Sequence, residues 1–98
     1  MSFAVKTITY QQNLMLNICD ANLVGRTITK DDFSLNISKS YFAERFVEKA
    51  EAKELLKKYA IINMVGYETI SLSINLGIGS LKGVKEIGNI PFLLVFKF

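Results

Sequence analysis

The most regular pattern along the chain is a helical spacing of apolar residues between Glu48 and Tyr59. Apolar side chains recur there at intervals of three and four residues, which gathers them on one face of an α-helix. They are Ala52, Leu55, Leu56 and Tyr59. Lysines and glutamates fill most of the other positions, so the pattern predicts an amphipathic helix with one buried face.

The region before this helix has the pattern of extended chain. Residues 3–10 and 14–19 are rich in apolar and β-branched residues and flank a short polar turn, which indicates an opening hairpin. Residues 26–28 and 33–37 are also predicted to be extended, with a polar turn between them. Residues 38–45 show no clear period.

Three more segments after the helix are predicted to be strands. Residues 60–65 form a short apolar run, which is typical of a buried strand. Residues 84–87 and 92–98 predict two closing strands joined through a Gly-Asn turn. Pro91 has no N–H to donate to a neighbouring strand, so we expect it at the beginning of a strand or on a sheet edge.

The segment between these strands gives conflicting signals. Residues 70–78 alternate strictly between apolar residues and small or polar ones, which narrowly favours a strand. Gly77 followed by Ile78 is typical of a helix C-terminus. Glu68 suits the first turn of a helix, near the positive end of its dipole. From the residues alone, both structures stay open.

Composition restricts the chemistry that the chain can perform. The 98 residues match the size of one domain, residues 1–98, and half of them are apolar, which is ample for one core. The chain contains no histidine and a single cysteine, Cys19, so it cannot form an internal disulfide and lacks the commonest zinc ligand and general base. We therefore expect no metal, no cofactor and no catalytic residue, and we lean against an enzyme.

Charge and hydropathy restrict the partners. The net charge of +3 is compatible with contact to RNA and equally with ordinary solubility, and nothing indicates DNA specificity. No apolar run approaches the ~20 residues that span a bilayer, and the N-terminus lacks the features of a signal peptide. We expect a cytoplasmic protein without membrane contact.

Three segments together resemble a known family. They are Asn17-Ile-Cys-Asp20 with Leu23-Val-Gly25, Ala60-Ile-Ile-Asn-Met-Val-Gly66 with Glu68 and Leu76-Gly-Ile78, and Ile87-Gly-Asn-Ile-Pro91. The chain resembles a group of small archaeal proteins known only as a domain of unknown function, and the resemblance covers nearly its whole length. The family's usual His after the closing Pro is Phe92 here, so any role of that His cannot hold in this chain.

The resemblance implies an α+β domain in which residues 66–76 form a helix, because relatives carry Ala, Val and Leu at the positions of Ser71 and Ser73. We therefore predict a small single α+β domain, a mostly antiparallel sheet with two helices packed on it. The resemblance brings no established activity, and it implies an association with translation machinery.

The polar residues of the family-like segments are candidate ligand-binding residues. If Asp20, Asn63 and Glu68 converged, two carboxylates and an amide could form a polar pocket or hold a hard cation. The alternative is that Asp20 and Glu68 cap turns and helices and that Asn63 makes an inward hydrogen bond. Cys19 lies beside an acid, which disfavours a reactive thiolate, so we predict a core residue.

Two surfaces are candidates for contact with a partner. The lysine face of the predicted helix could contact nucleic acid or protein, although glutamates interrupt it and such faces are often simply solvated; its lysines are Lys49, Lys53, Lys57 and Lys58. The alternating residues of the last strand, Phe92, Leu94, Phe96 and Phe98, are predicted to form a core face. Aromatic residues on a sheet can instead stack on bases, and an exposed edge strand can pair with a second chain.

These features lead to three functional hypotheses. The favoured one is a non-catalytic binding module that docks on a larger assembly, ribosomal or other RNA–protein machinery. The second is a small ligand-binding protein or enzyme that uses Asp20, Asn63 and Glu68. The third is a homo-oligomer, such as a homodimer formed through the strand Phe92–Phe98. The glycine-rich segment 77–83 is not a nucleotide loop, because its spacing matches no phosphate-binding motif and no helix is predicted after it.

Overall fold

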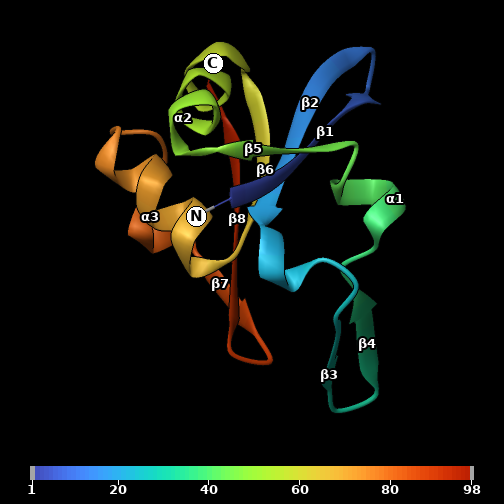
Figure 1. The fold of residues 1–98 in the computed structure, drawn as a ribbon. Coiled ribbons are helices and arrows are strands. Elements are labelled where there is room, and N and C mark those ends of the chain that lie inside the picture. The colour runs from blue at the N-terminus through green and yellow to red at the C-terminus, as the bar shows by residue number, and fades with distance from the viewer. Residues whose placement is uncertain (1, 98) are drawn as a thin grey trace.

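The computed structural model describes residues 2–97 (Figure 1), which form an α+β domain. Its strands are β1 (Ser2–Tyr10), β2 (Asn13–Asp20), β3 (Thr27–Lys30), β4 (Phe33–Asn36), β5 (Arg45–Glu48), β6 (Ile61–Val65), β7 (Lys85–Ile87) and β8 (Ile90–Phe96). Its α-helices within this range are α1 (Lys39–Phe42), α2 (Lys49–Lys58) and α3 (Tyr67–Asn75), and two short 3₁₀ turns are η1 (Ala21–Leu23) and η2 (Leu81–Gly83).

Six strands form one mostly antiparallel sheet in the order β5-β1-β2-β6-β8-β7, and β3 and β4 form a separate hairpin. The central pair, β2 and β6, is parallel, with Asn17 opposite Asn63. The other neighbours in the sheet are antiparallel. The predicted fold class, a small α+β domain with a mostly antiparallel sheet and two helices packed on it, is confirmed.

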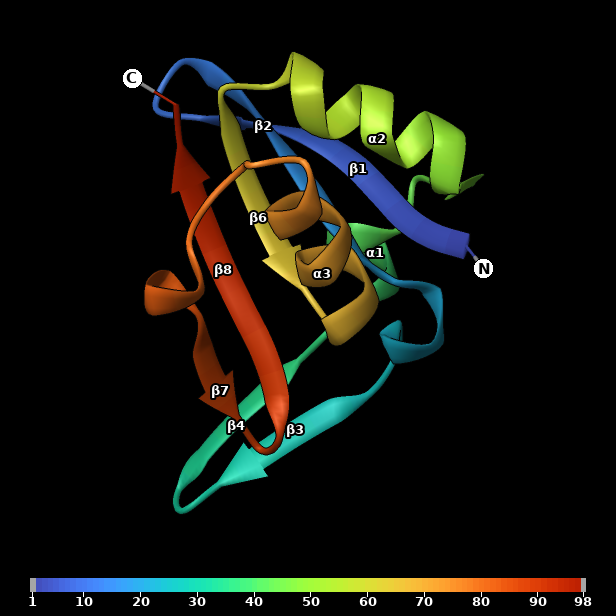
Figure 2. The same cartoon turned by 90° about the vertical axis from the view of Figure 1, so that its left-hand side faces the viewer.

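Apolar side chains form a core on each face of the sheet, one of which α2 and α3 cover (Figure 2). The helices α2 and α3 cover one face, and the larger core lies beneath them; it includes Phe3, Val5, Leu16, Ile18, Leu56, Ile62, Met64, Ile70 and Leu93. A smaller core lies on the other face, where η1, α1 and the β3–β4 hairpin contribute side chains along with the sheet; it includes Ala4, Cys19, Leu23, Ile28, Ile37, Phe42 and Val65.

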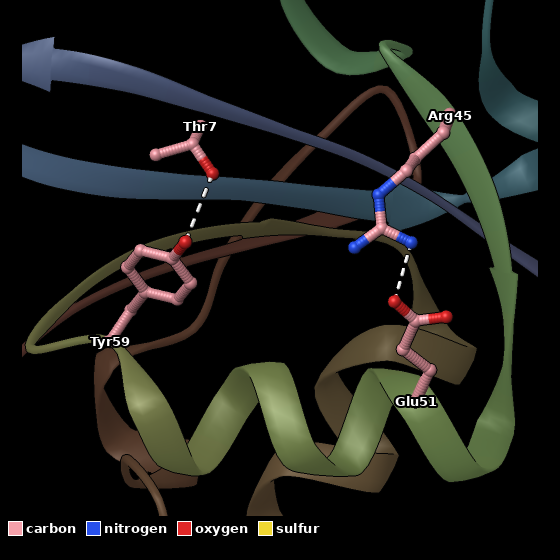
Figure 3. Close-up of polar contacts among 4 residues, drawn as sticks. All are labelled: Thr7, Arg45, Glu51 and Tyr59. Atoms are coloured by element: carbon pink, nitrogen blue, oxygen red, sulfur yellow. Dashed lines mark hydrogen bonds and ion pairs between the residues drawn. The ribbon is translucent and has the colours of Figure 1, made fainter.

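Polar contacts tie α2 to the sheet at both of its ends (Figure 3). Near its beginning, the carboxylate of Glu51 pairs with the guanidinium of Arg45 on the edge strand β5. After its last turn, the Tyr59 hydroxyl accepts a hydrogen bond from Thr7 Oγ1 on β1 at 3.3 Å. The two contacts fix the helix along β1, with Ala52 and Leu56 turned into the core.

The helix implied for residues 66–76 is confirmed as α3, so the strict alternation of residues 70–78 was misleading. The glycine signal was correct: Gly77 has φ +78°, Ile78 N donates to Ser73 O at 3.0 Å, and Gly77 N donates to Ile74 O at 2.9 Å. This pair of bonds is the Schellman ending of a helix. Ser73 occupies a buried position because its hydroxyl donates to Ile78 O at 2.7 Å.

Most of the predicted strands are confirmed, and two elements were missed. The helix α1 lies within residues 38–45, which show no clear period, and the strand β5 begins at the end of this stretch; each is only four residues long. The strand β5 is an edge strand, and its Phe46 is exposed, so it lacks the apolar alternation of a half-buried strand. No helix within residues 2–97 is long and apolar enough to cross a membrane.

Candidate functional site

On the face opposite α2 and α3, one end of the sheet carries large exposed apolar side chains. There, register places two rows of side chains across β1, β2, β6 and β8. The first row is Ile8, Met15, Ile61 and Phe96, and the second is Lys6, Asn17, Asn63 and Leu94. Together with Tyr10, which follows Ile8 on the same face, we call these rows the open sheet face.

Large apolar side chains of the open sheet face are exposed to solvent. Leu94 is 50% exposed, Phe96 46% and Tyr10 36%. The ring of Tyr10, on β1, and the ring of Phe96, on β8, lie 6.3 Å apart, centroid to centroid. Met15 and Ile61 lie between them in the row and are buried, yet they belong to neither core.

The prediction that the alternating residues of the last strand form a core face is wrong for Leu94 and Phe96. The residues of β8 that alternate with these face the helices instead: Leu93 is 4% exposed and lies in the larger core. Phe92 packs against the smaller core, and Phe98 lies outside the described residues. Because the residues on both faces of this strand are apolar, its sequence did not show which face the helices cover.

A row of amides anchors the open sheet face to α1. Asn63 Nδ2 donates to Asn17 Oδ1 at 3.2 Å, and Asn17 Nδ2 donates to the Tyr41 carbonyl at 3.0 Å. In the same row, Lys6 Nζ donates to the Ser40 carbonyl at 2.6 Å. Asn17 is fully buried, so its amide is positioned by these partners, and the inward hydrogen bond expected for Asn63 is present.

Asp20 lies at the end of β2 and caps the N-terminus of α3. Its Oδ1 accepts hydrogen bonds from Thr69 N at 2.8 Å and from Thr69 Oγ1 at 2.7 Å, and its Oδ2 accepts one from Glu68 N at 3.1 Å. A carboxylate at this place satisfies N–H groups that have no partner within the helix and complements the helix dipole. Both carboxylate oxygens are thereby engaged in holding α3 to the sheet.

Gly66 makes this contact possible. Its φ of +110° is unfavourable for residues with a side chain, and a Cβ at this position would overlap the carboxyl group of Asp20. The combination of Asp20 with Gly66 and Glu68 in the family-like segments therefore has a structural role, since it joins the strand β2 to the first turn of α3.

The structure brings together two of the three candidate ligand-binding residues. Asp20 and Glu68 line a pocket of about 270 Å³ together with Ser2, Ala21 and Asn22. Asn63 lies on the opposite face of the sheet, in the amide row, and does not line this pocket.

Cys19 is a core residue, as predicted. Its side chain is fully buried in the smaller core. Burial, and to a lesser degree the negative charge of Asp20, raises the pKa of the thiol to about 12. The thiolate that nucleophilic chemistry requires is therefore strongly disfavoured at neutral pH.

The lysine face of α2 is a surface of mixed charge. The ammonium of Lys57 lies 3.6 Å from the Glu54 carboxylate, and that of Lys58 lies 5.5 Å from the centroid of the Tyr59 ring. Lys53 is half-buried and Lys49 is exposed. The acids on this helix therefore offset much of the positive potential that an RNA phosphate would require.

Lys97, which follows β8, caps the C-terminal end of α2, and no local pattern in the sequence indicated this contact. Lys97 Nζ donates to the carbonyls of Leu56 at 2.6 Å and Lys57 at 3.2 Å, near the negative end of the helix dipole. Desolvation lowers the pKa of this ammonium.

Comparison with known proteins gives a family and a fold. The sequence profile of the family described as "Protein of unknown function (DUF424)" matches residues 8–98. An uncharacterised conserved protein from Methanopyrus kandleri has a similar crystal structure, with a TM-score of 0.81 over 100% of this chain and 93% of that one, at 18% sequence identity. No curated protein matches.

Proposed function

The chain belongs to the DUF424 family of proteins of unknown function, and we propose that it is a non-catalytic binding module that docks on a larger assembly through the open sheet face. The class of assembly that we propose is translation or other RNA–protein machinery. The observation that carries the proposal is the 50% exposure of Leu94 on the open sheet face, where α1 contacts Lys6 and Asn17 at the other end of the same row.

The side chains of the open sheet face suit a protein contact. Exposed apolar side chains that cluster on one surface mark interaction sites, and aromatic residues supply much of the energy at such interfaces. The rings of Tyr10 and Phe96 lie close to each other on this surface, and Leu94 lies opposite Asn63 on the neighbouring strand. The Asn63 amide provides a polar group that can fix the register of a bound partner.

Charge supports docking on a protein component of the assembly. The lysine of the open sheet face, Lys6, already donates a hydrogen bond to the Ser40 carbonyl. The lysines of α2 alternate with glutamates, two of which are paired with Arg45 and Lys57. Binding through this apolar face should therefore depend weakly on salt, whereas binding to phosphates falls steeply as salt rises.

A pull-down from native lysate with and without ribonuclease tests the proposal. Wild-type protein should retain components of the same RNA–protein assembly in both conditions, and Leu94→Lys should lose them. Leu81→Lys is the matched control, because Leu81 is exposed at 71% and belongs to η2, away from this face. Equal capture by wild type and Leu94→Lys, or capture that ribonuclease abolishes, would contradict the proposal.

A second candidate is a homo-oligomer formed through β8. The strand β7 pairs with β8 only from Ile90 to Phe92, so Leu93–Val95 have no strand neighbour on that side within residues 2–97. An unpaired strand edge can accept a strand from another copy. Sedimentation equilibrium tests this candidate: a monomeric mass across micromolar concentrations would rule it out.

A further inference from the structure

A cleft lies on the helical side of the sheet, between α3 and the segment that leads into β7. This α3 cleft has a volume of about 530 Å³. Its apolar lining comes from Ile70 and Ile74 of α3 and from Val84 and Pro91. Ligand-binding clefts of folded proteins measure about 300–1,000 Å³ and combine such a lining with a few polar groups.

The polar side of the cleft carries one ionisable pair. Tyr67 Oη donates to Glu86 Oε2 at 2.7 Å, across the cleft from α3 to β7. This hydrogen bond, the largest of the effects on the phenol, raises the pKa of Tyr67. Glu86 is exposed and makes no ion pair with a residue of the described chain, so its carboxylate is available to a cationic ligand.

The rim of the cleft is held in place by the turn that carries Leu81. The Ser80 hydroxyl accepts a hydrogen bond from Lys82 N at 3.2 Å, which caps η2. Gly79 packs so closely on β8 that a Cβ there would lie 2.9 Å from side-chain atoms of Leu93 and Val95. These contacts keep Leu81, which is 71% exposed, at the mouth of the cleft, where a bound apolar group would cover it.

We propose that the α3 cleft binds a small organic ammonium compound, whose apolar body lies on Ile70, Ile74 and Val84 and whose cationic group pairs with Glu86. Charge complementarity supports this ligand class: the cleft offers an apolar lining and one carboxylate, which the Tyr67 hydroxyl orients. A neutral ligand would leave the carboxylate without a cation, and an anionic ligand would be repelled. This site is distinct from the open sheet face, and its occupancy does not require docking.

A matched series of indole probes tests the proposal. The chain contains no tryptophan, so excitation of the indole reports the probe alone, by fluorescence anisotropy. Tryptamine, tryptophol and indole-3-propionate share an apolar body and differ in charge. Tryptamine should bind about fivefold more tightly than tryptophol, as expected for a partly exposed ion pair, and indole-3-propionate should bind most weakly.

Substitutions test whether this order of probe affinities arises from binding in the cleft. Glu86→Gln should abolish the preference for tryptamine over tryptophol, and Glu54→Gln, on the far surface of α2, should retain it. Methyl NMR shifts of Ile70, Ile74 and Val84 should follow the same titration. Equal affinity for the three probes, no binding at millimolar concentration, or an unchanged preference in Glu86→Gln would overturn the proposal.

Discussion

Asp20 and Thr69 lie 49 positions apart in the chain, yet the Asp20 carboxylate accepts hydrogen bonds from both the N–H and the hydroxyl of Thr69, at 2.8 and 2.7 Å. A single side chain at the end of β2 thus fixes where α3 begins. The two surfaces that we propose as binding sites lie on opposite sides of the sheet. The α3 cleft depends directly on the position of this helix, whereas the open sheet face is built on β1, β2, β6 and β8.

Removal of the cap should destabilise the fold. Asp20→Ala leaves the N–H groups of Glu68 and Thr69 without their acceptor, and we expect a loss of about 1–3 kcal/mol in the free energy of unfolding. Urea denaturation measures this loss. Glu68→Gln, an exposed change at the same helix end, should alter stability by less than about 0.5 kcal/mol; equal losses in the two variants would contradict the capping role.

Alanine substitutions at two glycines with positive φ distinguish the cost of backbone strain from the cost of steric overlap. Gly25→Ala introduces a Cβ into open space at φ +91°, and strain alone should cost about 1–2 kcal/mol. Gly66→Ala adds an overlap with the Asp20 carboxyl group, so its loss of stability should clearly exceed that of Gly25→Ala. Thermal unfolding of the two variants compares them directly. Similar losses would show that Asp20 moves away without cost.

Neighbouring leucines test the orientation of β8. Leu93→Ala removes a side chain from the larger core and should cost about 2–5 kcal/mol. Leu94→Ala changes a half-exposed side chain and should cost less than about 1 kcal/mol. Chemical denaturation gives both values, and the reverse order would mean that the helices cover the other face of this strand.

The buried thiol should make stability depend on pH in the alkaline range. Burial raises the pKa of Cys19 to about 12, whereas an unfolded cysteine ionises near pH 8.5. Above that pH the unfolded state binds fewer protons than the folded state, so the stabilisation is complete below about pH 8.5 and declines as pH rises toward 12.

Cys19→Ala removes this titration. The stability of wild type relative to Cys19→Ala should therefore fall between pH 8 and pH 10, by up to about 1.4 kcal/mol per pH unit above the unfolded pKa. Urea titrations at both pH values measure the difference. A constant difference between the two proteins would mean that the thiol ionises equally in the folded and unfolded states.

Local signals in the sequence predicted the elements that are defined by local contacts. The helical spacing of residues 52–59 predicted α2, and Gly77 with Ile78 correctly indicated the end of α3. The orientation of β8 could not be predicted, because Phe92–Phe96 is apolar at every position and the side that α3 covers is decided by the tertiary fold.

Contacts between segments that are distant in the sequence were also not predicted. The amide pair Asn17–Asn63 requires the parallel pairing of β2 with β6, and the pair Tyr67–Glu86 requires β7 to lie beside α3. Neither pair leaves a periodic signal in the sequence. Asp20 was correctly considered as a cap, but its partner helix lies 49 positions away, at Thr69.

We propose that the open sheet face docks on a protein component of an RNA–protein assembly. The most direct measurement compares how tightly wild type, Leu94→Lys and Leu81→Lys bind the assembly recovered in the pull-down, at low and high salt. We predict that Leu94→Lys weakens binding at least tenfold, that Leu81→Lys binds like wild type, and that salt changes the wild-type affinity little. Unchanged affinity of Leu94→Lys, or a steep loss of wild-type binding with salt, would show that the protein does not dock through this apolar face.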